Sequence, residues 1–122
     1  MTTITAKPAT PAVEPDEEDF FAKSGPMPGT FDEVRKFPRF YFRYCFTAIV
    51  HQPRGEGSPS EHVIPTRDVS RAGLSVLHSE QLYPGQRLLI MGVNDADRPV
   101  EVQWCRRLAA QRYVAGCRFV KH

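Results

Sequence analysis

The sequence contains 122 residues, of which 41% are hydrophobic and 25% are charged. This length is enough for one folded domain and a tail. No apolar run approaches the roughly 18–20 residues that cross a bilayer as a helix. Residues 1–21 also lack the basic start and the apolar stretch of a secretory signal. These exclusions predict a cytoplasmic protein without membrane insertion.

The charge of the chain is distributed unevenly along its length. Residues 1–33 carry two lysines and seven acidic residues, a net charge of −5, whereas residues 34–122 carry fourteen Lys or Arg and seven acids, a net charge of +7. Twelve of the sixteen basic residues are arginines, which favours planar, bidentate recognition of anions. A basic body with an acidic tail indicates an anionic ligand, nucleic acid or lipid headgroups, although a solvated charged surface gives the same balance.

Residues 1–32 are expected to form a flexible, acidic, proline-rich tail. Five of the eleven prolines lie within its first thirty residues, and such a composition buries too little apolar surface to offset the entropy of ordering. Within the tail, we expect a short helix over residues 16–23, because acidic residues occupy its first turn and Gly25 follows its end. Residues 30–33 resemble a capping box for one further helical turn. The folded domain is predicted to occupy residues 33–122.

From residue 40 onward the pattern predicts strands separated by turns. The six predicted strands are residues 40–50, 62–69, 73–78, 87–93, 99–107 and 113–120. In the fifth strand Val100, Val102 and Trp104 alternate with the residues between them, so Trp104 is expected in the core. Short strands with regular turn signals and no long helix predict an all-β antiparallel barrel or sandwich.

The sequence offers no pattern typical of catalysis or of metal binding. The four histidines are scattered, at positions 51, 62, 78 and 122, and no nucleophile elbow, phosphate-binding loop, dinucleotide fingerprint or zinc-protease motif occurs. The cysteines are odd in number and lack CxxC spacing, which disfavours a disulfide framework and a thiolate zinc site. We expect them to be reduced packing residues: Cys45, Cys105 and Cys117. The chain is therefore predicted not to be an enzyme and to hold no metal or cofactor.

Two short motifs stand out against this background. Arg35 and Arg39 form an RxxxR pattern where the tail meets the first predicted strand, and residues 68–73 form a DxSxxG pattern between the second and third strands. Each motif is weak alone, because RxxxR occurs twice more in this chain and DxSxxG also suits a plain hairpin with local Asp and Ser bonds and a Gly of positive φ. Arg43 belongs to one of the other RxxxR patterns, and we expect it to be an outward-facing, solvated side chain of the first strand.

Together, and in this order, the two motifs resemble those of the PilZ domain, the bacterial receptor for cyclic di-GMP. The resemblance covers residues 33–120 and extends to three further segments: residues 84–85, 102–104 and 116–119. It implies a six-stranded, Greek-key-like antiparallel β-barrel. It also implies a cyclic di-GMP site formed by five residues: Arg35, Arg39, Asp68, Ser70 and Gly73.

The residue types at these positions suit a dinucleotide with two phosphates and two guanines. An Arg fork bonds a pair of phosphate oxygens or the O6/N7 edge of guanine, and its flat face stacks on a purine. Asp68 accepts hydrogen bonds from guanine N1–H and N2–H₂, a pair of donors that adenine does not present. Ser70 adds a hydroxyl contact, and Gly73 lets backbone and ligand approach closely without a Cβ.

The resemblance implies a cyclic di-GMP receptor that transmits the signal through contacts with an unidentified protein partner and binds no DNA. Two alternatives stay open. One is a PilZ-like adaptor that binds protein without nucleotide, although such adaptors tend to lose the residues that are intact here. The other is a small single-stranded nucleic-acid-binding barrel, which fits the basic body but does not explain Asp68 in the middle of the site.

Overall fold

The computed structural model describes residues 17–27, 38–55 and 57–120. These residues form one short helix, one 3₁₀ turn and seven strands. In chain order the elements are α1 (Glu17–Ala22), β1 (Phe40–Tyr41), β2 (Cys45–Val50), η1 (Pro53–Gly55), β3 (Ser60–Val69), β4 (Gly73–His78), β5 (Arg87–Val93), β6 (Ala96–Ala109) and β7 (Arg112–Phe119).

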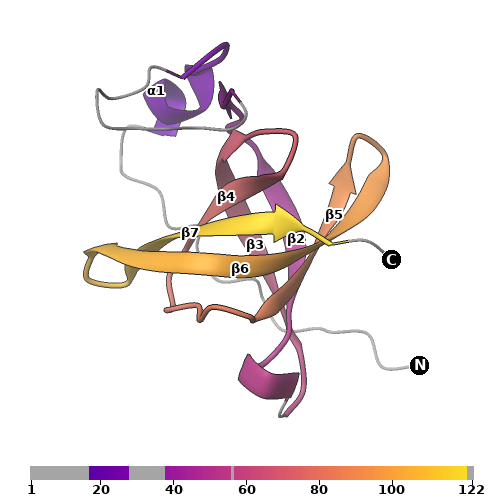
Figure 1. The fold of residues 1–122 in the computed structure, drawn as a ribbon. Coiled ribbons are helices and arrows are strands. Elements are labelled where there is room, and N and C mark those ends of the chain that lie inside the picture. The colour runs from indigo at the N-terminus through magenta and orange to yellow at the C-terminus, as the bar shows by residue number, and fades with distance from the viewer. Residues whose placement is uncertain (1–16, 28–37, 56, 121–122) are drawn as a thin grey trace.

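Six of these strands close into an antiparallel barrel (Figure 1). The order around the barrel is β3, β2, β5, β6, β7 and β4, and β4 pairs back with β3 to complete the ring. β6 and β7 form the long hairpin that crosses the front of the view in Figure 1, while β1 pairs with β3 beyond the end of β2. The predicted six-stranded antiparallel barrel is therefore confirmed, and β4 and β5 have the predicted bounds.

The prediction of one continuous strand over residues 40–50 is wrong. Residues 42–44 face only two residues of β3, so the ladder between the two strands is interrupted. The buried hydroxyl of Thr66 fills the interruption, donating to the carbonyl oxygen of Phe42 and accepting from the N–H of Tyr44. The extra residue bends the segment as a bulge does and separates β1 from β2.

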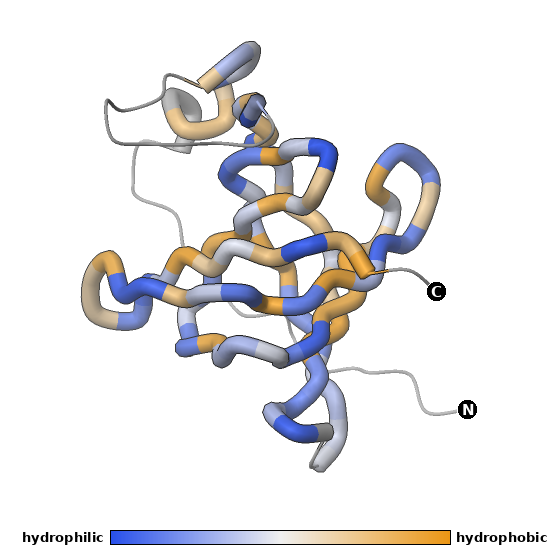
Figure 2. The backbone as a smooth tube through the Cα atoms, viewed as in Figure 1, coloured by the Kyte–Doolittle hydropathy of each residue, from blue (hydrophilic) through white to orange (hydrophobic). Residues whose placement is uncertain are grey.

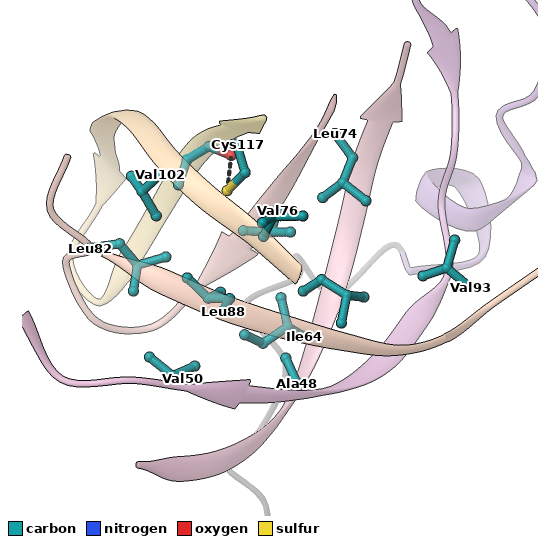
Figure 3. Packing of buried hydrophobic residues seen from close by; sticks show 13 residues of the cluster. Ala48, Val50, Ile64, Leu74, Val76, Leu82, Leu88, Val93, Val102 and Cys117 are labelled. Carbon is teal, nitrogen blue, oxygen red and sulfur yellow. Dashed lines mark hydrogen bonds between the residues drawn. The ribbon is translucent and has the colours of Figure 1, made fainter. Parts of the chain in front are cut away.

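The interior of the barrel is apolar (Figure 3). The buried side chains form one cluster: Ala48, Val50, Ile64, Leu74, Val76, Leu82, Leu88, Ile90, Val93, Val100, Val102, Ala115 and Cys117. Hydrophobic and hydrophilic residues alternate along much of the strands, as the colours in Figure 2 show. Each fully buried Val, Leu or Ile stabilises the fold by roughly 1.5–3 kcal/mol. The cluster therefore fixes which face of each strand points outward.

β4 is buried along its whole length and on both of its faces. Leu74 and Val76 belong to the core cluster, so strand alternation places Gly73, Ser75 and Leu77 on the outer face. Ser75 is nevertheless only 2% exposed, and Leu77 only 6%. The outer side of β4 is therefore a second structured surface of the barrel.

The segment that follows α1 runs beside β1. The N–H of Met27 donates to the carbonyl oxygen of Arg39 at 2.9 Å, and the N–H of Tyr41 donates to that of Gly25 at 2.8 Å. The helix predicted over residues 16–23 is confirmed as α1, within one residue at each end. The predicted capping box and the predicted domain boundary at residue 32 lie outside the described residues. No helix in the described ranges is long and apolar enough to cross a membrane.

Arg43 connects α1 to the barrel, and the expectation that it is solvated is wrong. Its guanidinium carbon lies 4.1 Å from the centroid of the Phe20 ring and 5.0 Å from that of Tyr41. Its Nε donates to the carbonyl oxygen of Arg67 at 2.9 Å. Burial among these groups lowers the pKa of the guanidinium from its ordinary value. Arg43 is therefore held by cation–π contacts whose aromatic partner in α1 the strand pattern does not reveal.

None of the three cysteines forms a disulfide. Cys105 pairs with Ala115 and Cys117 with Val102, so these two cysteines do not face each other across the β6–β7 ladder. Cys117 is buried in the core, and burial raises the pKa of its thiol to about 12. Cys45 is exposed, so the expectation that all three are packing residues is wrong for this one.

Candidate functional site

A hollow of about 200 Å³ lies on the outer face of β3, β4, β7 and β6. We call it the outer pocket, and its lining residues are Arg39, Asp68, Ser70, Ala72, Gly73, Leu74, Ser75, Gln103, Trp104, Gly116, Cys117 and Arg118. Four of the five predicted site residues are thus brought together here. The fifth, Arg35, lies outside the described residues, and its role stays a prediction.

The pocket is built on one row of residues that crosses four strands. Asp68 of β3 pairs with Ser75 of β4, Ser75 pairs with Gly116 of β7, and Gly116 pairs with Trp104 of β6. Directly paired residues of antiparallel strands point to the same face of the sheet. With neighbouring strands about 4.8 Å apart, the row from Asp68 to Trp104 spans roughly 14 Å. A carboxylate and an aromatic ring therefore stand at opposite ends of one shallow floor.

A second row runs beside the first and carries charge. Gly73 pairs with Arg118 of β7, and Arg118 pairs with Glu101 of β6. Nη2 of Arg118 lies 3.0 Å from Oε1 of Glu101, and the same carboxylate is 3.1 Å from Nε of Arg87. The hydrogen bond from Arg118 lowers the pKa of Glu101. The half-exposed guanidinium of Arg118 is thus oriented at the rim of the outer pocket.

Asp68 is nearly buried, with 4% of its surface exposed. Its Oδ2 accepts a hydrogen bond from Nε of Arg67 at 3.0 Å. A buried carboxylate is costly unless a partner compensates its charge, and Arg67 supplies that partner. The adjacent arginine therefore holds the Asp68 side chain in place at the pocket floor.

Ser70 and Gly73 form the tight connection between β3 and β4. The N–H of Ser70 donates to the carbonyl oxygen of Gly73 at 2.8 Å, and the Ser70 hydroxyl accepts from the N–H of Ala72 at 3.2 Å. Gly73 does not have a positive φ. A Cβ at this position would overlap the carbonyl oxygen of Cys117 in β7. The absent Cβ of Gly73 thus lets β4 approach β7, and the predicted close approach of a ligand at Gly73 stays a prediction.

Trp104 is not a core residue, contrary to the sequence prediction. The register of β6 against β7 shifts between Val102 and Trp104, which inserts Gln103 as an extra residue. Such a bulge reverses the alternation of faces, so Val102 points into the core while Trp104 points outward and is 37% exposed. A Cβ on Gly116 would overlap the indole ring. The ring therefore lies over the bare backbone of Gly116.

Several pocket residues were not predicted as part of the site: Ser75, Gln103, Trp104, Gly116 and Arg118. The sequence carries no clear signal for Ser75, because its place depends on the pairing across β4. A usable signal exists for the other four, since they lie in the segments 102–104 and 116–119 that resemble a PilZ domain, although the outward position of Trp104 depends on the β6 bulge.

A histidine pair lies at the other end of β4, away from the outer pocket. The ring centroids of His62 and His78 are 4.9 Å apart, and Oγ of Ser60 lies 2.8 Å from Nε2 of His62. Burial, and secondly His62, lowers the pKa of His78 to about 4. No group of three His, Cys, Asp or Glu side chains that could hold a metal ion occurs within residues 17–27, 38–55 and 57–120.

Comparison with known families agrees with this geometry. The model of the PilZ domain family matches residues 33–122, which contain every strand of the barrel and every residue that lines the outer pocket. No curated protein sequence matches the chain. On the strength of the family match, the chain belongs to the PilZ domain family, a family of cyclic di-GMP-binding domains.

Proposed function

We propose that this chain binds cyclic di-GMP in the outer pocket and acts as a receptor without catalysis. The observation that carries the proposal is the cross-strand row that ends in Asp68 on one side and Trp104 on the other. Arg39 and Arg118 line the same hollow. One small surface therefore combines a guanine acceptor, an aromatic platform and two cations.

Each of these groups matches one part of the ligand. The carboxylate of Asp68 accepts from N1–H and N2–H₂ of a guanine, and the flat face of Trp104 stacks on a base. Arg39 and Arg118 neutralise phosphates or stack on the second base. A purely phosphate-binding or single-stranded nucleic-acid surface gains nothing from a buried carboxylate in the pocket, which favours cyclic di-GMP over the nucleic-acid alternative.

The chain also offers a route by which binding reaches the surface. The backbone N–H of Met27 donates a hydrogen bond to the carbonyl oxygen of Arg39. This bond ties the backbone of a pocket residue to the segment that carries α1. A ligand that draws Arg39 into the pocket changes the position of β1 and of this segment. We propose that the altered surface is what a cytoplasmic protein partner contacts.

Isothermal titration calorimetry of the full chain tests the proposal. Cyclic di-GMP is expected to bind with measurable heat, while GTP and cyclic di-AMP bind far more weakly. The absence of heat and of a thermal stability shift at high cyclic di-GMP concentration would favour the adaptor instead.

Two arginine variants localise the site in the same experiment. Arg39→Ala should cost about 2 kcal/mol of binding free energy, or roughly thirtyfold in Kd, because it removes a charge-assisted contact. Arg98→Ala is the matched control, since Arg98 is exposed on β6 and does not line the pocket. Equal losses from both variants would indicate non-specific attraction by the basic surface.

A further inference from the structure

The outer pocket contains a further polar side chain, that of Ser75. Ser75 is 2% exposed and lines the pocket from the middle of β4. Its Oγ has no hydrogen-bond partner within the described part of the chain. The only other buried side-chain atom in this condition there is Nδ1 of His62, which does not line the pocket.

An unpartnered buried hydroxyl costs stability, because the group has lost its water without gaining a protein partner. Buried polar groups of native proteins are therefore nearly always bonded, and an exception calls for a reason. Alanine would fill the same place on β4 without this cost. The position of Ser75 at a ligand pocket supplies a reason, since a ligand can provide the missing partner.

The pairing of the strands fixes what lies on each side of Ser75. Asp68 is its direct neighbour on β3 and Gly116 its direct neighbour on β7, each about one strand spacing away. Gly116 is the residue over which the indole of Trp104 lies. A base that stacks at Trp104 and reaches Asp68 with its edge must therefore pass over Ser75.

From this placement we propose that Ser75 is a further ligand-contacting residue. Its hydroxyl forms a hydrogen bond with the same guanine edge that donates to Asp68. The proposal rests on cyclic di-GMP binding in the outer pocket. The Asp68 carboxylate is only an acceptor, and it takes N1–H and one N2–H of the base. The second N2–H and the O6 oxygen remain on that edge. A hydroxyl can satisfy either of them, because it both donates and accepts.

The test compares Ser75→Ala with the parent chain by calorimetry and thermal melting. Ser75→Ala should weaken cyclic di-GMP binding about three- to tenfold, as the loss of a neutral hydrogen bond does. The melting temperature of the ligand-free variant should be unchanged or higher, because an unsatisfied hydroxyl is removed. Ser75→Cys, which keeps the shape of the side chain but replaces the hydroxyl with a larger, weakly bonding thiol, should lose affinity similarly. Ser79→Ala, outside the pocket, should lose none.

Combining Ser75→Ala with Asp68→Asn identifies the shared base edge. The loss in the double variant should be smaller than the product of the two single losses, since both residues bind one group. If the parent chain binds cyclic di-GMP and Ser75→Ala binds it with the same affinity, this inference is overturned and the proposed function stands. A lower ligand-free melting temperature in both Ser75 variants also overturns it, in favour of a packing role. A parent chain that does not bind cyclic di-GMP overturns the proposed function itself.

Discussion

The inner and outer faces of β4 and β7 differ in the side chains that they present, although alternate residues of the same two strands form both faces. The inner face presents Leu74 and Val76 of β4 with Ala115 and Cys117 of β7, all within the core cluster. The outer face presents glycines, an unpartnered serine hydroxyl and a charged arginine. The inner face is filled by apolar side chains, whereas the outer face has one buried hydroxyl, that of Ser75, without a hydrogen-bond partner in the described part of the chain.

This difference indicates which residues of a small barrel determine its stability and which determine ligand affinity. A chain of this size has one core, so the strands that line a ligand pocket also enclose that core. Inner-face substitutions should therefore act on unfolding, and outer-face substitutions should act on ligand affinity.

Gly73→Ala should break the division, because this outer-face residue has a structural role. The added Cβ would overlap the backbone carbonyl of Cys117, which no side-chain rotation relieves. We expect a loss of about 3 kcal/mol in the free energy of unfolding, the upper range for overpacking. Urea denaturation measures it. A variant as stable as the parent would show that β4 and β7 separate easily at this point.

The free energy of unfolding should depend on pH through His78, which is buried in β4. Its pKa is about 4 in the folded protein against 6.5 ordinarily, so between these values the unfolded chain binds more protons. The free energy of unfolding should therefore fall as the pH is lowered through this window, by about 2 kcal/mol between pH 6.5 and pH 5.

Urea denaturation at several pH values tests this dependence. His78→Gln should flatten the slope between pH 6.5 and pH 5, whereas His51→Gln should preserve it, because His51 is exposed. A parent chain whose stability does not change over this range would contradict the burial of a neutral His78.

Gly116→Ala should sharpen the division by affecting binding more than folding. Here the added Cβ meets the indole of Trp104, a side chain that is 37% exposed and can shift outward. We expect a loss of about 1.4 kcal/mol, or tenfold, in cyclic di-GMP affinity, with a smaller change in the free energy of unfolding. Calorimetry and urea denaturation of one sample give both values, and a change confined to stability would contradict the platform role of Trp104.

Arg43→Ala should have the smallest effect and should spare the pocket. Arg43 contacts Phe20 and Tyr41 but does not line the outer pocket. Removal of a cation–π contact should cost about 1 kcal/mol of stability, read from the melting temperature, and should change cyclic di-GMP affinity less than twofold. A loss of affinity larger than that of Arg39→Ala would instead place the ligand-binding pair at residues 39 and 43.

The strands were predictable because hydrophobic alternation and turn residues are local signals. β4 and β5 have the predicted bounds, and four residues of the two motifs line one pocket: Arg39, Asp68, Ser70 and Gly73. Whether those residues bind ligand is a prediction that the binding experiments test. The position of Arg35 stays a prediction as well.

The residues whose positions were predicted wrongly share a physical cause. One extra residue in a strand changes the face on which the next side chains lie, and one partner far away in the sequence changes what covers a side chain. The bulge at Gln103 moves Trp104 from the expected core to the outer face, and the bulge at residues 42–44 divides the first strand. Arg43 is desolvated by Phe20, more than twenty residues earlier. The alternation of residues along a single strand contains neither piece of information.

Trp104 provides the most direct measurement, because it is the only tryptophan in the sequence and lies in the outer pocket. A guanine that stacks on the indole changes its emission, whereas binding elsewhere leaves the ring in its present surroundings. Titration of the full chain with cyclic di-GMP should give a saturable change in tryptophan fluorescence with the same Kd as calorimetry, and GTP should give none at equal concentration. Calorimetric binding of cyclic di-GMP without any change in Trp104 emission would contradict the outer pocket as the binding site.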